Sequence, residues 1–274
     1  MGSSAPTYRR THSERHRDGF SLVETVVVVS TTTLLVGLLL PSLRTARQQA
    51  QRALCLSNLR QMAIAAQSYA SVYDGHYPLA YYNRREGTVP YFYAWDFTTW
   101  KDWSDATNPT RVQPGLMWMS QTIEEVQQCP VFRGPGNSLA DPYTGYNYNT
   151  SYIGLNDLLS PVDSAQVTDV RRPSETALFG DGECTDGGAN KYMRAPFAHP
   201  GDTLLPDSAR HAGAQGYRHL SRTNVAFCDG HARSWRPIHT QTDPAARKVL
   251  DEHNATHDIR IGFLSATNDL YDLK

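Results

Sequence analysis

The sequence lacks the short motifs that mark many enzymes and nucleotide-binding proteins. It contains no P-loop, no dinucleotide-binding fingerprint, no internal repeat and no Ser/His/Asp or metal-hydrolase motif. Charge is also scarce, because Asp, Glu, Lys and Arg make up 19% of the chain and leave a formal net charge of −1. No basic stripe runs along a region that could fold, so the pattern typical of a nucleic-acid-binding domain is missing. We therefore expect neither catalytic activity nor a nucleic-acid partner.

The sequence does contain a long apolar segment near its N-terminus, at residues 20–40, in which Glu24 is the only charged residue. A helix rises ~1.5 Å per residue, so this segment spans roughly 30 Å, the thickness of a bilayer's hydrocarbon core. The preceding leader has an excess of arginine over acidic residues, which favours a cytoplasmic N-terminus, although three arginines shortly after the segment reduce this asymmetry. We expect one membrane span, with the rest of the chain exported.

The order of features around this segment resembles the class III signal of type IV pilins and pseudopilins. Gly19 ends the leader, Phe20 opens the apolar core, Glu24 lies five places into it and Pro41 follows it. An ordinary secretory signal is cleaved after its apolar core. The resemblance instead implies cleavage between Gly19 and Phe20, with methylation of the new N-terminus, by a prepilin peptidase/N-methyltransferase. A plain signal-anchor is the alternative.

A carboxylate inside a membrane is costly and is by default a functional residue. For Glu24 the resemblance supplies a partner, the free amino group of Phe20 on a neighbouring subunit. It further implies a single-pass inner-membrane protein whose head lies in the periplasm or at the cell exterior and whose N-terminal helix packs against other pilin-like subunits. The expected parts are the leader (1–19), a transmembrane and filament-core helix (20–41), an amphipathic helix (42–75) and the head (76–274).

The pattern becomes amphipathic after Pro41, which predicts that the helix continues into the head. Asp74-Gly75 is a typical helix-ending signal. Pro41 should kink or locally melt the helix, because proline removes a backbone hydrogen bond. The core-facing stripe repeats at steps of three and four residues and comprises Cys55, Leu59, Met62, Ala66, Tyr69 and Tyr73.

The head, residues 76–274, is expected to be rich in strands and long loops. Asp243-Pro244 predicts the start of a short helix that ends near Asp251. A long helix laid on an antiparallel sheet is an α+β arrangement, which agrees with the pilin-like fold that the resemblance implies. The expected strands are Tyr146–Ile153, Thr176–Phe179, Asn224–Cys228, Ala232–Pro237 and Ile259–Leu264.

The C-terminal part carries a second resemblance. His219 is followed by nine residues and then Asp229-Gly230, which resembles the H-X9-DG motif of a subfamily of pseudopilin-like proteins. The segment from Tyr77 to Gln127 departs from this subfamily because it holds an insertion. Shorter matches to the subfamily occur in order along the chain at Cys55–Gln61, Tyr77-Pro78, Cys129-Pro130 and Gly180-Asp181.

Two interpretations of the H-X9-DG motif remain open. Asp229-Gly230 after an apolar run predicts a hairpin turn, and His219 would then pin the incoming segment to that turn. In the second interpretation the motif contributes to a metal or acid–base site, because histidines and carboxylates on adjacent strands can present mixed ligands. That site would use His219, Asp229, His231 and Asp181.

The chain has four cysteines, and in an exported domain an even number permits disulfides. Cys55 on the helical stripe can meet Cys129, while Cys184 and Cys228 follow two expected strands. We therefore expect the pairs Cys55–Cys129 and Cys184–Cys228, with four buried free thiols as the alternative. No C-x-x-C pair is present, which argues against a zinc ribbon.

Two further segments are candidate binding surfaces. The loop from Gly180 to Gly188 holds Asp181, Glu183 and Asp186, which could bind Ca²⁺ as some pseudopilins do, although the loop lacks EF-hand spacing. We expect no other cofactor. Residues 77–103 are dense in Tyr, Phe and Trp, which form either ordinary packing or a recognition face for sugars or proteins.

These observations and the resemblance predict a structural subunit, a pseudopilin or minor pilin of a type II secretion or type IV pilus-like filament. Such a subunit needs no catalytic residue. The alternative is a membrane-tethered exported protein that binds glycans or metals, or acts as an enzyme, and uses a pilin-type anchor.

Overall fold

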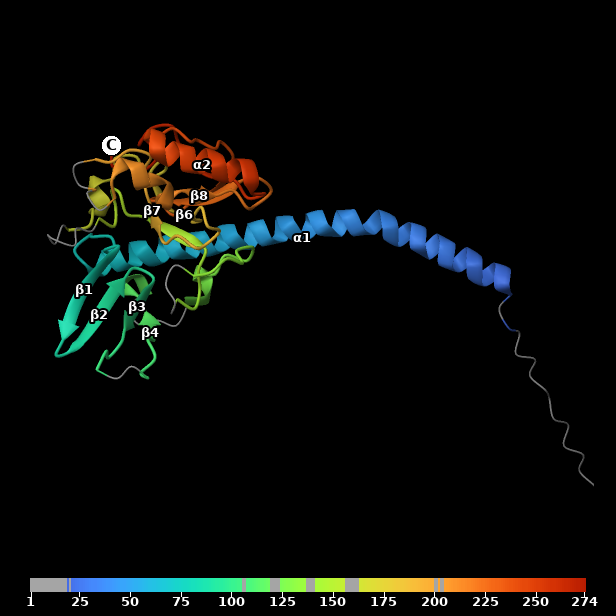
Figure 1. Ribbon diagram of the computed structural model, residues 1–274, viewed down its shortest axis with the longest axis horizontal. Coiled ribbons are helices and arrows are strands. Elements are labelled where there is room, and N and C mark those ends of the chain that lie inside the picture. The colour runs from blue at the N-terminus through green and yellow to red at the C-terminus, as the bar shows by residue number, and fades with distance from the viewer. Residues whose placement is uncertain are drawn as a thin grey trace, which may run out of the picture. The chain divides into compact units, whose positions relative to one another are not determined.

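The structure is a computed structural model that describes residues 19, 21–104, 107–118, 124–136, 141–155, 163–199, 202 and 205–274. The chain divides into two compact units, Met1–Ala46 and Arg47–Lys274. Helix α1 (Leu22–Val72) contributes residues to both units (Figure 1). The combination of a long N-terminal helix with mainly antiparallel sheets confirms the α+β class.

In the first unit, α1 is apolar on all sides. Among the described residues it is the one helix long and apolar enough to cross a membrane. The hydroxyls of Thr31, Thr32 and Thr33 donate to carbonyls one turn back in the helix, at 2.9, 2.8 and 2.7 Å, which satisfies these polar groups internally. The helix also continues through Pro41. The predicted local melting is therefore not observed, although Pro41 still lacks the N–H of a regular helical residue.

In the second unit, one face of α1 is buried. The predicted stripe is confirmed from Cys55 to Ala66 and extends to Ala70. Tyr69 and Tyr73 were wrongly placed on it, because Tyr69 is only half-buried and Tyr73 is exposed, and their rings stack on each other at 4.1 Å. The helix ends where expected, since Gly75 adopts a positive φ of 82° and its N–H donates to the Ala70 carbonyl at 2.9 Å.

A four-stranded antiparallel sheet follows the helix in the chain. Its strands pair in sequence order, as β1 with β2, β2 with β3 and β3 with β4. This sheet lies in the segment that departs from the resembled subfamily, and no strand was predicted there. The strands are β1 (Tyr81–Glu86), β2 (Val89–Ala94), β3 (Phe97–Trp100) and β4 (Arg111–Pro114).

A five-stranded sheet forms the centre of the head, in the order β10-β9-β6-β5-β7. Only β5 and β7 pair in parallel. Four of these strands correspond to predicted ones, but β5 is shorter because the chain turns after Asn149, whose carbonyl accepts the Gly154 N–H at 2.9 Å. The strands are β5 (Tyr146–Asn149), β6 (Ala177–Asp181), β7 (Tyr192–Met193), β9 (Thr223–Phe227) and β10 (Ala232–Trp235).

The remaining elements are short, apart from one helix. Helix α2 (Pro244–Thr256) begins as predicted, with the Asp243 carboxylate accepting the Ala245 N–H at 2.8 Å, but it runs past Asp251. The strand predicted at Ile259–Leu264 is reduced to β11, which pairs with β8. The short elements are β8 (Gln215–Gly216), β11 (Ile261–Gly262), η1 (Leu116–Trp118), η2 (Glu124–Gln127), η3 (Val167–Asp169) and η4 (Asp207–Gly213).

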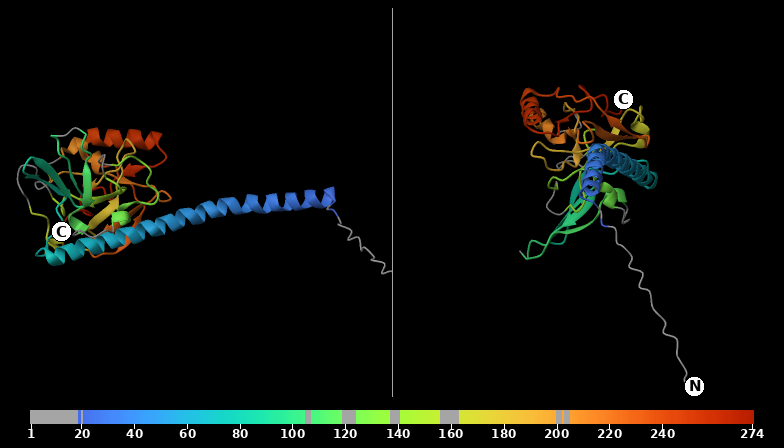
Figure 2. Two further views of the ribbon diagram at one scale, coloured as in Figure 1. Left: turned by 90° about the horizontal axis from the view of Figure 1, so that it is seen from below. Right: turned by 90° about the vertical axis from the view of Figure 1, so that its right-hand side faces the viewer.

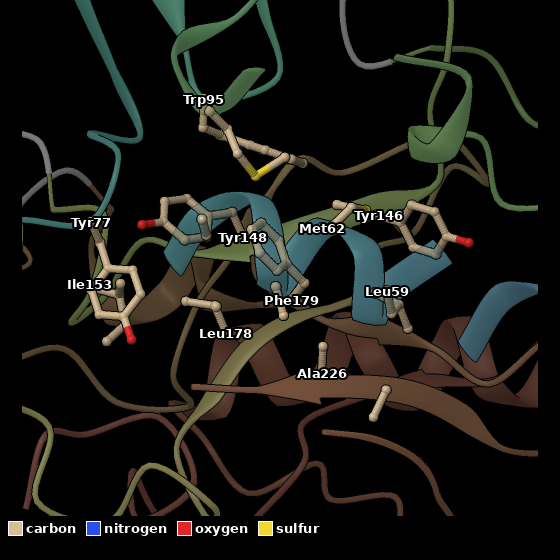
Figure 3. Close-up of a cluster of buried hydrophobic side chains, with 14 of the residues drawn as sticks. Leu59, Met62, Tyr77, Trp95, Tyr146, Tyr148, Ile153, Leu178, Phe179 and Ala226 are labelled. Carbon is tan, nitrogen blue, oxygen red and sulfur yellow. The ribbon is translucent and has the colours of Figure 1, made fainter. Parts of the chain in front are cut away.

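Within the head, the second half of α1 runs between the β1–β4 sheet on one side and the five-stranded sheet and α2 on the other (Figures 1 and 2). Leu59 and Met62 of α1 lie among aromatic side chains from the central sheet and from the connection between β2 and β3, as Figure 3 shows. Ring centroids in this core are 5.0–5.7 Å apart, a spacing typical of favourable aromatic packing. The rings belong to Trp95, Tyr148 and Phe179.

Candidate functional site

Two of the predicted processing residues, Gly19 and Glu24, are described, and they lie just before α1 and in its first turn. Gly19 is exposed, whereas Phe20 lies outside the described residues. Ser21 and Glu24 form a reciprocal capping pair, because the Glu24 carboxylate accepts the Ser21 N–H at 2.8 Å and the Ser21 hydroxyl accepts the Glu24 N–H at 3.2 Å. Glu24 therefore has a local role in helix initiation. The S-x-x-E spacing could have revealed this role from the sequence.

Asp229-Gly230 forms the predicted hairpin turn, between β9 and β10. Gly230 adopts a positive φ of 89°, and its N–H donates to the Phe227 carbonyl at 2.9 Å. Asp229 bonds to His231, with its Oδ1 2.5 Å from the Nδ1 of the histidine. The Gln67 side chain on α1 donates to the Cys228 carbonyl at 2.8 Å, which ties this turn to the helix.

His219 does not pin the hairpin turn, so that part of the prediction is wrong. It lies at the opposite end of β9, in a tight turn where the His219 N–H donates to the Arg222 carbonyl at 3.0 Å. Strand β9 has five residues, which at ~3.3 Å per residue separate the two ends of the motif by roughly 17 Å. The predicted set of His219, Asp229, His231 and Asp181 is therefore split into two pairs.

The buried pair, Asp181 and His219, belongs to a cluster with two cysteines. Asp181 ends β6, Cys55 lies on α1, and Cys129 and His219 lie in loops before β5 and β9. Their potential ligand atoms all lie within 4.8 Å of one another, and all four side chains are buried. We call these four residues the Cys–Asp–His cluster. The sequence pointed separately to its cysteine pair and to Asp181 with His219, but not to their convergence.

The contacts inside the cluster are close. The Cys55 Sγ lies 3.3 Å from Asp181 Oδ1. The Nε2 of His219 is 3.5 Å from the Cys129 Sγ and 3.5 Å from the same Asp181 oxygen. The other carboxylate oxygen of Asp181 accepts the Asn224 backbone N–H at 2.6 Å. Two polar groups, from Cys55 and His219, thus converge on one oxygen of Asp181, while a backbone donor fixes the orientation of the carboxylate.

Arg218 borders the cluster and carries its nearest permanent positive charge. Its guanidinium pairs with Glu183 at 2.8 Å, lies 3.7 Å from Asp181 Oδ1, and donates to the carbonyls of Gly145 and Gly182 at 2.6 and 3.1 Å. The side chain is fully buried. Sequence reasoning did not single out Arg218, and only its position directly before the motif histidine could have drawn attention to it.

The ionisation of the cluster follows from burial and charge. Burial opposes the ionisation of Asp181, but the positive charges of His219 and Arg218 outweigh burial and lower the pKa of this carboxyl. Burial also opposes protonation of His219, yet the Asp181 carboxylate raises the pKa of the imidazole to about 9. Burial raises the pKa of the Cys55 thiol. For the Cys129 thiol, the hydrogen bond from Cys55 and the positive charge of Arg218 overcome burial and lower the pKa.

All four cysteines carry free thiols, so neither expected disulfide is present. Cys55 and Cys129 are close, as predicted, but their sulfur atoms face Asp181 and His219. The other two cysteines have different neighbours, because Cys184 contacts the Ala189 carbonyl at 3.6 Å while Cys228 is buried beside Tyr77.

The three carboxylates of the proposed calcium loop do not converge. Asp181 faces the Cys–Asp–His cluster and Glu183 pairs with Arg218. Asp186 accepts the Gly188 N–H at 2.8 Å within its own turn. Each carboxylate has its own protein partner, so the described geometry does not assemble a calcium site from these residues.

The aromatic segment packs in the core in one part and stays half-buried in another. Trp95 and Phe97 are buried in the core. On β2 and β3, Tyr91 stacks on Tyr93 at 5.8 Å and on Trp100 at 5.4 Å, and these rings are only half-buried. The half-buried rings offer a surface on which a planar ligand could stack.

Comparisons of this chain with protein-family models, with curated proteins and with solved structures found no match.

Proposed function

We propose that this chain is a structural pilin-like subunit, a pseudopilin or minor pilin of a type II secretion or type IV pilus-like filament. The observation that carries the proposal is the composition of α1. Its residues through Ala46 expose apolar side chains such as Val26, Leu34 and Leu38, each more than half exposed, whereas its residues from Cys55 to Ala70 bury one face in the head. An apolar helix surface without cover requires a bilayer or neighbouring helices.

The N-terminal features add support. The pilin-type signal at Gly19–Phe20 precedes this apolar helix, which fits cleavage by a prepilin peptidase/N-methyltransferase and retention of α1 in the mature protein. In this proposal the subunit spans the inner membrane once, its head is exported, and α1 packs against the helices of other pilin-like subunits.

Glu24 provides a test of assembly. Replacing Glu24 with alanine should leave membrane insertion intact, because removing a carboxylate from an apolar segment eases insertion. The same change should strongly reduce crosslinking to partner subunits, because the amino group of a neighbouring Phe20 loses its counter-charge. Crosslinking in membranes of a strain that assembles the filament is the measurement.

The capping role of Glu24 calls for a matched variant. Glu24→Gln removes the charge but can still cap the helix, since glutamine serves at this position of a capping box. Loss of crosslinking in both variants supports the charge pairing. Crosslinking at the wild-type level in Glu24→Gln, with loss in Glu24→Ala alone, would assign Glu24 only to helix initiation.

A glycan-binding function is the second candidate, favoured by the half-buried rings on β2 and β3. Two of these rings, those of Tyr91 and Trp100, line a hollow of about 120 Å³, together with Lys101 and Arg111. Quenching of tryptophan fluorescence by soluble glycans would favour this function, whereas unchanged fluorescence across a panel of cell-wall glycans would remove its support.

A further inference from the structure

We propose that Cys55, Cys129, Asp181 and His219 are the ligands of one structural zinc ion, which fastens α1 to the central sheet of the head. This inference does not depend on the proposed pilin-like function. The sequence contains no short motif and no zinc-ribbon spacing that would indicate this site.

Three separations within the cluster are close to those of a zinc tetrahedron. Zinc–sulfur bonds are about 2.3 Å long and zinc bonds to nitrogen or oxygen about 2.0–2.2 Å. Tetrahedral angles then place a sulfur about 3.6 Å from a nitrogen or oxygen ligand, and a nitrogen about 3.4 Å from an oxygen. The observed separations are 3.3 Å from Cys55 Sγ to Asp181 Oδ1, 3.5 Å from Cys129 Sγ to His219 Nε2 and 3.5 Å from His219 Nε2 to Asp181 Oδ1. The other pairs of ligand atoms lie within 4.8 Å of each other, so adjustments of the side chains would let one ion reach all four.

The types of ligand atom in the cluster indicate which metal it would bind. Two thiolates and an imidazole are ligands of zinc and other thiophilic metals, whereas Ca²⁺ and Mg²⁺ prefer oxygen. Four protein ligands with no open position characterise structural rather than catalytic zinc sites. The predicted role of Asp181 and His219 as metal ligands is thus retained, but with Cys55 and Cys129 in place of Asp229 and His231.

The groups around the cluster fit a zinc ion bound by two thiolates and one carboxylate. Two thiolates, Asp181 and the neighbouring Glu183 carry four negative charges, of which a divalent ion and the Arg218 guanidinium would together neutralise three. The Asn224 N–H holds one Asp181 oxygen, so that the other points at the sulfur of Cys55. Such outer contacts orient metal-binding side chains. The Tyr146 hydroxyl is buried beside Cys55 without a hydrogen bond of ordinary geometry, where it could donate to a thiolate.

A cleft in the head is lined by two residues that border the cluster. These residues are Arg218 and Glu183, and the volume of the cleft is about 380 Å³. The four ligands come from parts of the chain far apart in sequence, since Cys55 and Asp181 are 126 positions apart and Cys129 and His219 are 90 positions apart. A bound ion would thus contribute its binding free energy directly to the folding of the head.

The test uses full-length protein extracted in detergent without added metal, chelator or reductant. We expect elemental analysis to find one zinc per chain. Cys55 and Cys129 should resist alkylation until a chelator removes the zinc, and unfolding monitored by tryptophan fluorescence should occur at a lower temperature after chelation and recover on adding zinc alone.

Variants link the metal to the proposed ligands. Cys129→Ser and His219→Gln should lose the zinc, whereas Cys184→Ser, at a half-buried cysteine outside the cluster, should keep it. If a ligand variant fails to fold, cobalt replacing zinc in the wild type should give the visible absorption of tetrahedral cobalt–thiolate. A Cys55–Cys129 disulfide in the intact mass without bound metal would overturn the proposal, as would two reactive thiols in a folded zinc-free protein.

Discussion

Arg218→Met is expected to destabilise the head by about 3–5 kcal/mol, the range for removing one partner of a buried ion pair. The unbranched methionine can occupy much of the space of the arginine stem. It cannot replace the charge that pairs with Glu183 at 2.8 Å, nor the donors to the carbonyls of Gly145 and Gly182. The loss should therefore come from stranded polar groups rather than from a cavity.

Urea unfolding of the detergent-solubilised chain measures this effect. The chain has five tryptophans, all between residues 95 and 235, so their fluorescence reports on the head. Arg247→Met is the matched control, because Arg247 forms an exposed ion pair with Asp251 and should change stability by less than about 1 kcal/mol. Adding Glu183→Gln to Arg218→Met should restore part of the loss. Equal stability of Arg218→Met and the control variant would show that the buried pair contributes little.

Asp202→Asn should have an effect of similar size at a second buried network. The Asp202 carboxylate pairs with Arg194 at 2.6 Å and with Arg210 at 2.7 Å, and it also accepts the Ser151 hydroxyl at 2.6 Å. All of these side chains are buried. The isosteric amide would leave two neighbouring guanidinium groups without a counter-charge, which should destabilise the head by about 3–5 kcal/mol.

The pH dependence distinguishes charge loss from altered packing. Burial opposes ionisation of Asp202, but Arg194 and the hydrogen bonds from Arg210 and Ser151 lower its pKa below the usual range. A lowered pKa in the folded state means that the contribution of Asp202 is present above the unfolded-state pKa of about 3.9 and is lost as the pH falls through the lower folded-state value. The difference in unfolding free energy between the wild type and Asp202→Asn should therefore be largest near neutral pH and shrink below about pH 4.

A constant difference across this pH range would indicate that Asp202→Asn acts through packing. Asp251→Asn, at the exposed pair with Arg247, supplies the control for general effects of removing an aspartate.

Local sequence signals predicted much of the fold. The repeat of apolar residues located the buried face of α1, Asp74-Gly75 located its end, and Asp243-Pro244 located the start of α2. Each of these features depends on residues within a few positions of one another. The same kind of signal went unused at Gly87, whose positive φ of 61° lies in the turn between β1 and β2.

The candidate site depended on longer-range structure. The helical stripe that holds Cys55 and the H-X9-DG motif that holds His219 each indicated candidate site residues. Which of these residues meet depends on the order of the strands in the sheet. Because β9 pairs with β6, the residues before β9 meet Asp181 at the end of β6, and the hairpin turn lies at the other end. A sequence alone does not specify this pairing. One interpretation therefore placed His219 at the hairpin turn, the other joined it to Asp229 and His231 as well as to Asp181, and Arg218 was overlooked.

The most direct test of the pilin-like function is the intact mass of the full-length protein extracted from membranes of cells that contain a prepilin peptidase. A pilin-like subunit should have a mature chain that begins at Phe20 and carries one N-terminal methyl group, since cleavage after Gly19 retains the apolar helix. A chain that begins near residue 45, after the apolar segment, or one that keeps its leader, would contradict this function.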